Sequence, residues 1–317
     1  MISAASLAEP ARAKSQPSSG TRRHYPAQRD WTPVPPQVPA SEGLLDVGGD
    51  KIWYWDTGGG GPAVILLHAL TGSAANWGYQ QPVLRHAGYR VIAYSRRGHF
   101  KSQVGPDAVA GTAAADLHAL AAFLQLPSFH LLGTAGGAFV ANDYAISHPD
   151  SLLSLIIASS TGDIDDPAYK AACARLAAPD LLRLPSDLKE LGPAYRAGYP
   201  AGHARWNELE AMARTRPGAR QAKENDVSWE NVSKIRAPTL LISGGADSYS
   251  PPPIMEMVSA RIPNSSLVVI DEAGHSAYWE QPRAFNDAVL NFLGGISVNR
   301  KPAAALPRRV SQDTLGG

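Results

Sequence analysis

Short, fully apolar segments that alternate with helical stretches constrain the fold of this chain more than any other feature. The apolar segments lie at 51–55, 63–68, 90–95, 129–133, 152–159, 239–243 and 267–270, and the helical stretches at 74–87, 112–126, 136–148 and 282–293. Strands buried on both faces of a mainly parallel sheet lack the polar–apolar alternation of half-exposed strands. The pattern predicts an α/β fold, with a doubly wound sheet and an active site in loops at the carboxyl ends of the strands.

One segment interrupts this alternation and predicts an inserted unit. From 161 to 237 the sequence shows helical patterns, at 167–177, 186–199, 204–214 and 219–225, but no strand pattern. We expect a helical cap there, on a core made of 41–160 and 238–295. Its aromatic residues Tyr195, Tyr199 and Trp206 either line a substrate pocket or form the small core of the insertion. Apolar residues at helical spacing more often pack into a core.

Both ends of the chain are basic and differ from the body. Residues 1–40 carry seven prolines and five basic against two acidic residues, which predicts an extended or disordered arm. Residues 296–317 carry four basic residues against one acidic residue and form a basic C-terminal tail. Either end could be a solvated tail or could dock on an anionic surface or a neighbouring subunit. Docking on a neighbouring subunit would make the protein a homo-oligomer.

Composition excludes several classes of function. Lys plus Arg number 29 and Asp plus Glu number 28, so the chain lacks the positive excess of a dedicated nucleic-acid binder. The single Cys173 cannot form an intrachain disulfide, and no Cys/His cluster has zinc-site spacing. No apolar run is long enough to cross a bilayer, and the N-terminus lacks a signal-peptide core. We therefore expect a soluble, cytoplasmic protein.

The segment Gly133-Thr134-Ala135-Gly136-Gly137 follows an apolar run and begins a helical stretch. This is the context of a nucleophile elbow, in which a strained turn projects one side chain above the sheet. The helix N-terminus behind it supplies N–H groups and partial positive charge for an oxyanion. The projecting position is Ala135, which has no nucleophilic atom, and the hydroxyl of Thr134 should point away. Taken alone, the same pattern is also that of close helix packing.

An acid and a histidine follow in the order that a catalytic pair would need. Asp247 lies just after the 239–243 run, where an acid can orient and stabilise a histidine, although an Asp capping a turn looks the same. His275 lies after the 267–270 run, in a loop where a general base belongs. Upstream, His68-Ala69-Leu70 follows the run 63–67. The N–H groups of Ala69 and Leu70 could complete an oxyanion hole with that of Gly136, unless this is an ordinary strand-to-helix loop.

Together these residues resemble the α/β-hydrolase superfamily over about 45–295. The order Ala135, Asp247, His275 matches the family order of nucleophile, acid and histidine, and the run from Gly274-His275 to Glu280, Pro282 and Phe285 is typical of it. The segment 95–102 is similar to the family loop D-x-R-G-x-G-x-S, with Ser95 for Asp and Phe100 for Gly. The resemblance implies an eight-stranded sheet, a helical cap of the epoxide-hydrolase, C–C-hydrolase and esterase branch, and hydrolysis without a cofactor.

The resemblance also implies roles for individual residues. Asp247 and His275 would serve a nucleophile at position 135, where Ser is expected, and Ala69, Leu70 and Gly136 would hold the oxyanion. The candidate pocket residues are His68, Thr134, Tyr195, Tyr199, Trp206 and Tyr249. The expected substrate is a small, largely apolar ester or lactone.

Ala135 leaves three hypotheses for the function. The chain is an inactivated form of a serine esterase or lactonase, or a natural enzyme whose His275–Asp247 pair activates water or catalyses a lyase or cyclisation step. The third hypothesis is a ligand-binding protein without catalysis. An aspartate nucleophile of the dehalogenase kind is excluded by the residue at this position.

Overall fold

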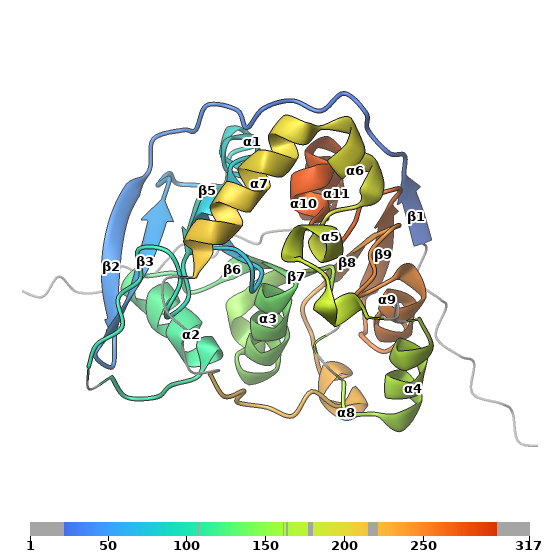
Figure 1. Ribbon diagram of the computed structural model, residues 1–317. Coiled ribbons are helices and arrows are strands. Elements are labelled where there is room, and N and C mark those ends of the chain that lie inside the picture. The colour runs from blue at the N-terminus through green and yellow to red at the C-terminus, as the bar shows by residue number, and fades with distance from the viewer. Residues whose placement is uncertain are drawn as a thin grey trace, which may run out of the picture.

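A nine-stranded sheet forms the centre of the computed structural model, which describes residues 22–106, 108–160, 162, 164–176, 180–214 and 221–296 (Figure 1). The strands are β1 (Arg22–Tyr25), β2 (Ser41–Val47), β3 (Asp50–Asp56), β4 (Ala63–Leu67), β5 (Arg90–Tyr94), β6 (Phe129–Thr134), β7 (Leu152–Ala158), β8 (Thr239–Gly244) and β9 (Ser265–Ile270). Their order is β1-β9-β8-β7-β6-β4-β5-β3-β2. Every pair from β1 through β5 along this order is parallel, while β3 pairs antiparallel with both β5 and β2. The predicted α/β fold with a mostly parallel sheet is confirmed.

The strands have unbroken apolar runs because helices cover both faces of the sheet. In β4, which is entirely buried, Ile65 and Leu67 belong to one core cluster and Val64 and Leu66 to the other. The first cluster includes residues of α2 (Ala113–Phe123), α3 (Gly136–Ser147), α8 (Trp229–Val232) and α9 (Pro252–Ser259). The second includes residues of η1 (Ala74–Trp77), α1 (Gln81–His86), α10 (Ala277–Glu280) and α11 (Pro282–Gly294). Successive side chains of a strand point to opposite faces, so both sets of residues are needed to fill the two cores.

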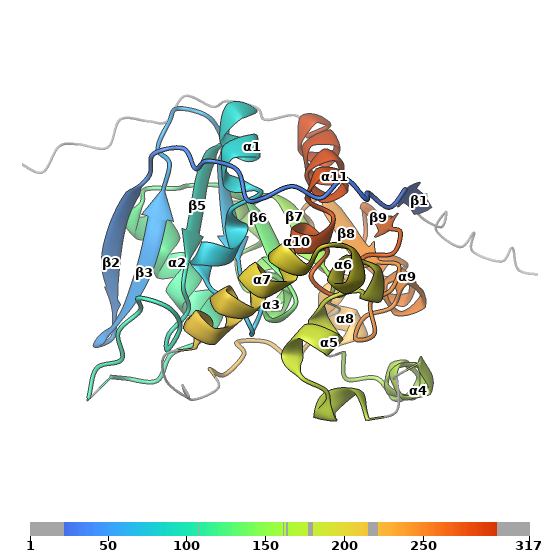
Figure 2. The same ribbon diagram turned by 45° about the horizontal axis from the view of Figure 1, so that its top comes forward.

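The sheet has one strand more than the eight that we expected, because Arg22–Tyr25 pairs in parallel with β9 at the edge. This strand is mostly exposed and polar, so it carries no apolar signal in the sequence. From β1 the chain crosses the molecule in an extended course and reaches β2 at the opposite edge (Figures 1 and 2). Hydrogen bonds hold this crossing segment: Trp31 Nε1 donates to Glu280 O (3.1 Å) and Tyr79 Oη donates to Thr32 O (2.6 Å). The part of the predicted arm before residue 22 and the basic tail from residue 297 onward lie outside the described residues.

The segment between β7 and β8 contains several helices in its described parts. It contains α4 (Pro167–Leu176), η3 (Leu181–Arg183), α5 (Ser186–Glu190), α6 (Pro193–Gly198) and α7 (Pro200–Ala213) before α8. The helix expected at 219–225 is absent from its described part, 221–225. There the backbone N–H groups of Glu224 and Asn225 donate to the carboxylate of Asp143 in α3, so the chain is fixed in a non-helical course (2.9 Å each). Within the described ranges, no helix combines the length and the apolar character that crossing a membrane requires.

Candidate active site

The turn between β6 and α3 is tight and strained. Ala135 lies between the two elements with φ 48° and ψ −116°, which L-residues rarely adopt. The flanking glycines are needed for close packing: a Cβ atom on Gly133 would lie 2.5 Å from Gly137 O, and one on Gly137 would collide with Leu67 O. The turn therefore presents residue 135 at the carboxyl end of a central strand, where the sequence pattern placed it.

His275 and Asp247 meet at the carboxyl ends of neighbouring strands. Asp247 follows β8 and His275 follows β9, and His275 Nδ1 donates to Asp247 Oδ1 and Oδ2, 3.0 Å from each. The Oδ1 atom also accepts the N–H groups of Tyr249 (2.8 Å) and Ser250 (3.0 Å). Both side chains are buried. Burial alone would raise the pKa of Asp247, but His275 and the two N–H groups outweigh it and lower that pKa.

Three carboxylates make His275 a stronger base than an ordinary histidine. Burial alone would lower its pKa, but Asp247, Glu190 and Glu280 favour the protonated ring and raise the pKa of His275 to about 9. The hydrogen bond to Asp247 keeps a proton on Nδ1, so Nε2 is the atom that can accept a proton. The pair thus has the tautomer that a general base needs, and the ring can act as a base in its neutral form, which predominates only above about pH 9.

Glu190 at the end of α5 joins the helical segment to two loops of the site. Its Oε1 accepts a hydrogen bond from Thr71 Oγ1 and its Oε2 from Ser276 Oγ, both at 3.2 Å. Burial raises the pKa of Glu190. No sequence pattern singles out Glu190, because a glutamate close to Asp187 and Lys189 looks like part of the exposed end of a helix.

Glu280 makes a second link between the helical segment and the histidine loop. Its carboxylate accepts the N–H groups of Gly192 (2.6 Å) and Gly274 (3.0 Å). Burial raises the pKa of Glu280 to about 8. In the sequence, Glu280 stood out only as part of the run that follows His275.

The loop after β4 lies against the turn at Ala135. His68 Nδ1 donates to Ala69 O (2.7 Å), and His68 Nε2 accepts the N–H of Arg96 (3.0 Å). Burial lowers the pKa of His68 well below its usual range, so the ring is neutral. A Cβ atom on Gly136 would lie 3.1 Å from Leu70 N. The candidate oxyanion donors Leu70 and Gly136 are therefore neighbours, and Ala69 beside them is buried.

Some of the remaining candidate pocket residues lie near His275 or at the turn, and the others pack against the crossing segment or in the second core cluster. The ring of Tyr249 lies 4.6 Å from that of His275, between centroids. Thr134 is buried at the end of β6, and its Oγ1 has no partner among the described residues. Tyr195 and Tyr199 instead pack on Trp31 of the crossing segment, at 5.8 and 6.3 Å between ring centroids. Trp206 is buried in the second core cluster.

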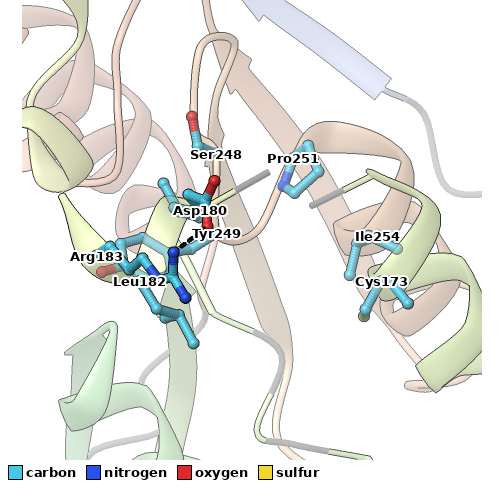
Figure 3. A pocket seen from close by; sticks show the side chains of 10 residues that line it. Cys173, Asp180, Leu182, Arg183, Ser248, Tyr249, Pro251 and Ile254 are labelled. Atoms are coloured by element: carbon cyan, nitrogen blue, oxygen red, sulfur yellow. Dashed lines mark ion pairs between the residues drawn. The ribbon is translucent and has the colours of Figure 1, made fainter. Parts of the chain in front are cut away.

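A cavity of about 510 Å³ lies on the side of Tyr249 where α4, η3 and α9 meet. Figure 3 shows Tyr249 next to Asp180 and Arg183 of the lining, which form an ion pair (3.2 Å). The lining is mainly apolar: Cys173, Ala174, Asp180, Leu181, Leu182, Arg183, Ser248, Tyr249, Pro251 and Ile254. Tyr249 thus borders both the His275–Asp247 pair and a space that could hold part of a small apolar molecule.

Comparison with known proteins assigns the family. Residues 64–288 match the model of the alpha/beta hydrolase family, and the chain belongs to this family. The chain is 31% identical over 260 residues to RutD of Variovorax paradoxus, provisionally named a carbamate hydrolase, covering 77% of this chain and 96% of the relative. It is 30% identical over 271 residues to a 2-hydroxy-6-oxononadienedioate/2-hydroxy-6-oxononatrienedioate hydrolase of Burkholderia vietnamiensis, covering 77% and 91%.

A solved structure agrees with this assignment. The structure of a thermophilic esterase from Thermogutta terrifontis is similar, with a TM-score of 0.66 and 26% identity, over 81% of this chain and 99% of the esterase. The fold and the family that the sequence motifs implied are therefore confirmed.

Proposed function

We propose that this chain is built to hydrolyse a carboxylic ester or a lactone by a nucleophile–His–Asp mechanism, with Ala135 at the position of the nucleophile. The observation that carries the proposal is the buried His275–Asp247 pair, which lies at the same end of the sheet as the strained turn. The similarity to an esterase and to other hydrolases supports this class of reaction. The cavity beside Tyr249 and its apolar lining support a small, largely apolar substrate.

With a serine at position 135, the proposed reaction has two acyl-transfer steps. The serine oxygen attacks the carbonyl carbon, while His275 Nε2 takes the hydroxyl proton and Asp247 stabilises the charged ring. The N–H groups of Gly136 and of Ala69 or Leu70 bind the oxyanion. The C–O bond to the leaving group then breaks, and His275 returns its proton to the departing oxygen. Water repeats both steps and releases the acid.

The chain as written lacks the atom that forms the acyl intermediate. The general base, its orienting acid and the candidate oxyanion donors are all retained. Loss of a nucleophile of this kind lowers the rate by orders of magnitude, although binding and oxyanion stabilisation continue. We therefore expect little acyl-transfer activity from the chain with Ala135.

The basicity of His275 favours a second candidate function. Asp247, Glu190 and Glu280 raise the pKa of His275 to about 9, so its neutral form is a stronger base than an ordinary histidine. In that form His275 could deprotonate a water molecule that attacks the substrate directly, or abstract a proton from the substrate in a lyase or cyclisation step. In direct hydrolysis, the water oxygen bonds to the carbonyl carbon and His275 Nε2 takes the water proton. The C–O bond to the leaving group then breaks, and His275 gives this proton to the departing oxygen.

One assay series separates these functions. The chain and its Ala135→Ser variant are tested on a panel of aryl and alkyl esters and lactones, with His275→Ala as the control in each background. The first proposal predicts turnover and labelling by a fluorophosphonate only in the Ala135→Ser variant. The second predicts turnover with Ala135 that His275→Ala abolishes and the fluorophosphonate leaves unchanged. If neither form turns over and ligand binding tolerates His275→Ala and Asp247→Ala, the chain is a ligand-binding member of the family.

A further inference from the structure

Arg96 follows β5 closely, and its side chain reaches the loop after β4. Its Nη2 lies within hydrogen-bond distance of two successive backbone carbonyls, 3.4 Å from His68 O and 3.3 Å from Ala69 O. Its own N–H donates to His68 Nε2, so main chain and side chain hold the same loop. The Nε atom is buried and has no partner among the described residues.

The two carbonyls that Arg96 contacts belong to the peptide groups of the candidate oxyanion donors. The carbonyl of His68 shares its peptide group with the N–H of Ala69, and the carbonyl of Ala69 shares its own with the N–H of Leu70. In a trans peptide the N–H points opposite to the C=O. A cation on the carbonyl side therefore fixes the N–H direction and makes that N–H a stronger donor. Ala69 O also accepts His68 Nδ1–H and the N–H of Gly72 (3.1 Å), which polarises the second peptide further.

The same guanidinium lies next to the turn at Ala135. A Cβ atom on Gly136 would lie 3.1 Å from Leu70 N and 3.3 Å from Arg96 Nη2. Because Gly136 has no side chain, the Leu70 nitrogen and the guanidinium of Arg96 can both lie close to the backbone of the turn. In the proposed reaction, negative charge develops on a substrate carbonyl oxygen bound at this turn.

The charge of Arg96 has no carboxylate partner among the described residues. The adjacent Arg97 shows the contrast, because it pairs with Asp116 at 2.7 Å and with Asp50 at 3.1 Å. Burial lowers the pKa of Arg96 to about 10, so the side chain remains protonated at neutral pH. A half-buried cation without a counter-ion is costly, and an oxyanion would offset that cost. The neighbouring ionisable groups, none of which carries negative charge at neutral pH, are His68, Tyr94, His99 and Arg214.

We propose that Arg96 is a positioning residue that orients and polarises the N–H groups of Ala69 and Leu70 toward an oxyanion at the turn. The inference rests on the proposed function, because it assumes a reaction that places negative charge there. It adds a cation that acts through the backbone of the loop and stabilises the transition state more than the ground state.

The first test needs no activity and uses the chain as it is. The amide resonances of Ala69 and Leu70 are compared in ¹H–¹⁵N spectra of the unmodified chain, Arg96→Met, Arg96→Lys and the control Arg214→Met. Loss of the guanidinium should move both amide protons upfield, Lys should restore part of the shift, and Arg214→Met should leave both unchanged. Unchanged resonances in a folded Arg96→Met variant would overturn the proposal. If that variant does not fold, Arg96→Gln, which is also uncharged, takes its place.

The second test uses the Ala135→Ser background. Arg96→Met should lower kcat for ester hydrolysis about tenfold or more and leave KM nearly unchanged, with partial recovery in Arg96→Lys. A raised KM with unchanged kcat would contradict a role in the transition state. If Ala135→Ser gains no activity, the proposed function fails while the amide resonances still decide the role of Arg96.

Discussion

Ala135 combines a strained backbone with a side chain that cannot act as a nucleophile. Its φ of 48° and ψ of −116° are unfavourable for an L-residue, and its methyl group has no reactive atom. Ala135→Gly should therefore stabilise the protein, by about 1 kcal/mol, because glycine adopts this conformation without a steric penalty. Urea unfolding measures the difference. The control is Ala138→Gly inside α3, which should destabilise by a similar amount. A loss of stability in Ala135→Gly would show that the turn is not strained.

His275 provides a second prediction at the scale of the residue. Its ring should titrate near pH 9, and Glu190→Gln should move this pKa downward because one carboxylate that favours the protonated ring is removed. The chemical shift of the ring Hε1 proton, followed from pH 5 to pH 11, measures both values. Glu208→Gln, at an exposed position of α7, is the control and should change nothing. Titration near the ordinary value of 6.5 would contradict the account.

The same shift has a consequence for stability. A pKa raised in the folded state stabilises the fold fully below the unfolded value of 6.5, and this contribution is lost as the pH rises through about 9. The stability of the unmodified chain should therefore decrease over this window more than that of His275→Gln, which cannot titrate. Urea unfolding at a series of pH values measures the two profiles. Equal pH dependence of the two proteins would argue against the raised pKa.

At the scale of elements, the helical segment is joined to the histidine loop by very close packing. A Cβ atom on Gly274 would collide with Gly192 N, and Glu280 binds the N–H groups of both glycines. Gly274→Ala should destabilise the protein by about 1–3 kcal/mol, because the two backbones would have to separate. Gly294→Ala near the end of α11 has open space around it and should be neutral or slightly stabilising. Thermal unfolding of both variants checks this contrast, and equal effects would contradict it.

At the scale of the molecule, the segment from β1 to β2 connects the two edges of the sheet and contacts the helical segment on its way. Trp31 packs on Tyr195 and Tyr199 and donates to Glu280 O. Trp31→Ala should cost about 1–3 kcal/mol and increase amide hydrogen exchange in 193–213. Phe123→Ala, which removes an exposed ring from Tyr54, is the control and should leave exchange in that range unchanged. Unaltered exchange in Trp31→Ala would show that the crossing segment does not support these helices.

Features that depend on a short stretch of sequence could be predicted, whereas features that depend on contacts between distant residues could not. The strands were predictable because burial on both faces leaves unbroken apolar runs, and the meeting of Asp247 with His275 followed from their places after two such runs. The edge strand β1 was not predictable, because an exposed strand has polar residues and therefore no apolar run. The roles of Glu190 and Arg96 could not be predicted for another reason. Each acts through contacts with loops from distant parts of the sequence, and no local pattern records such contacts.

The most direct test of the central claim is the hydrolytic activity of Ala135→Ser against that of the unmodified chain. We propose that the base, its carboxylate and the candidate oxyanion donors are assembled around residue 135, which lacks a hydroxyl. From this proposal we expect the single substitution Ala135→Ser to create fluorophosphonate-sensitive ester or lactone hydrolysis, which His275→Ala then removes. A correctly folded Ala135→Ser protein that neither reacts with the fluorophosphonate nor turns over any substrate of the panel would contradict it.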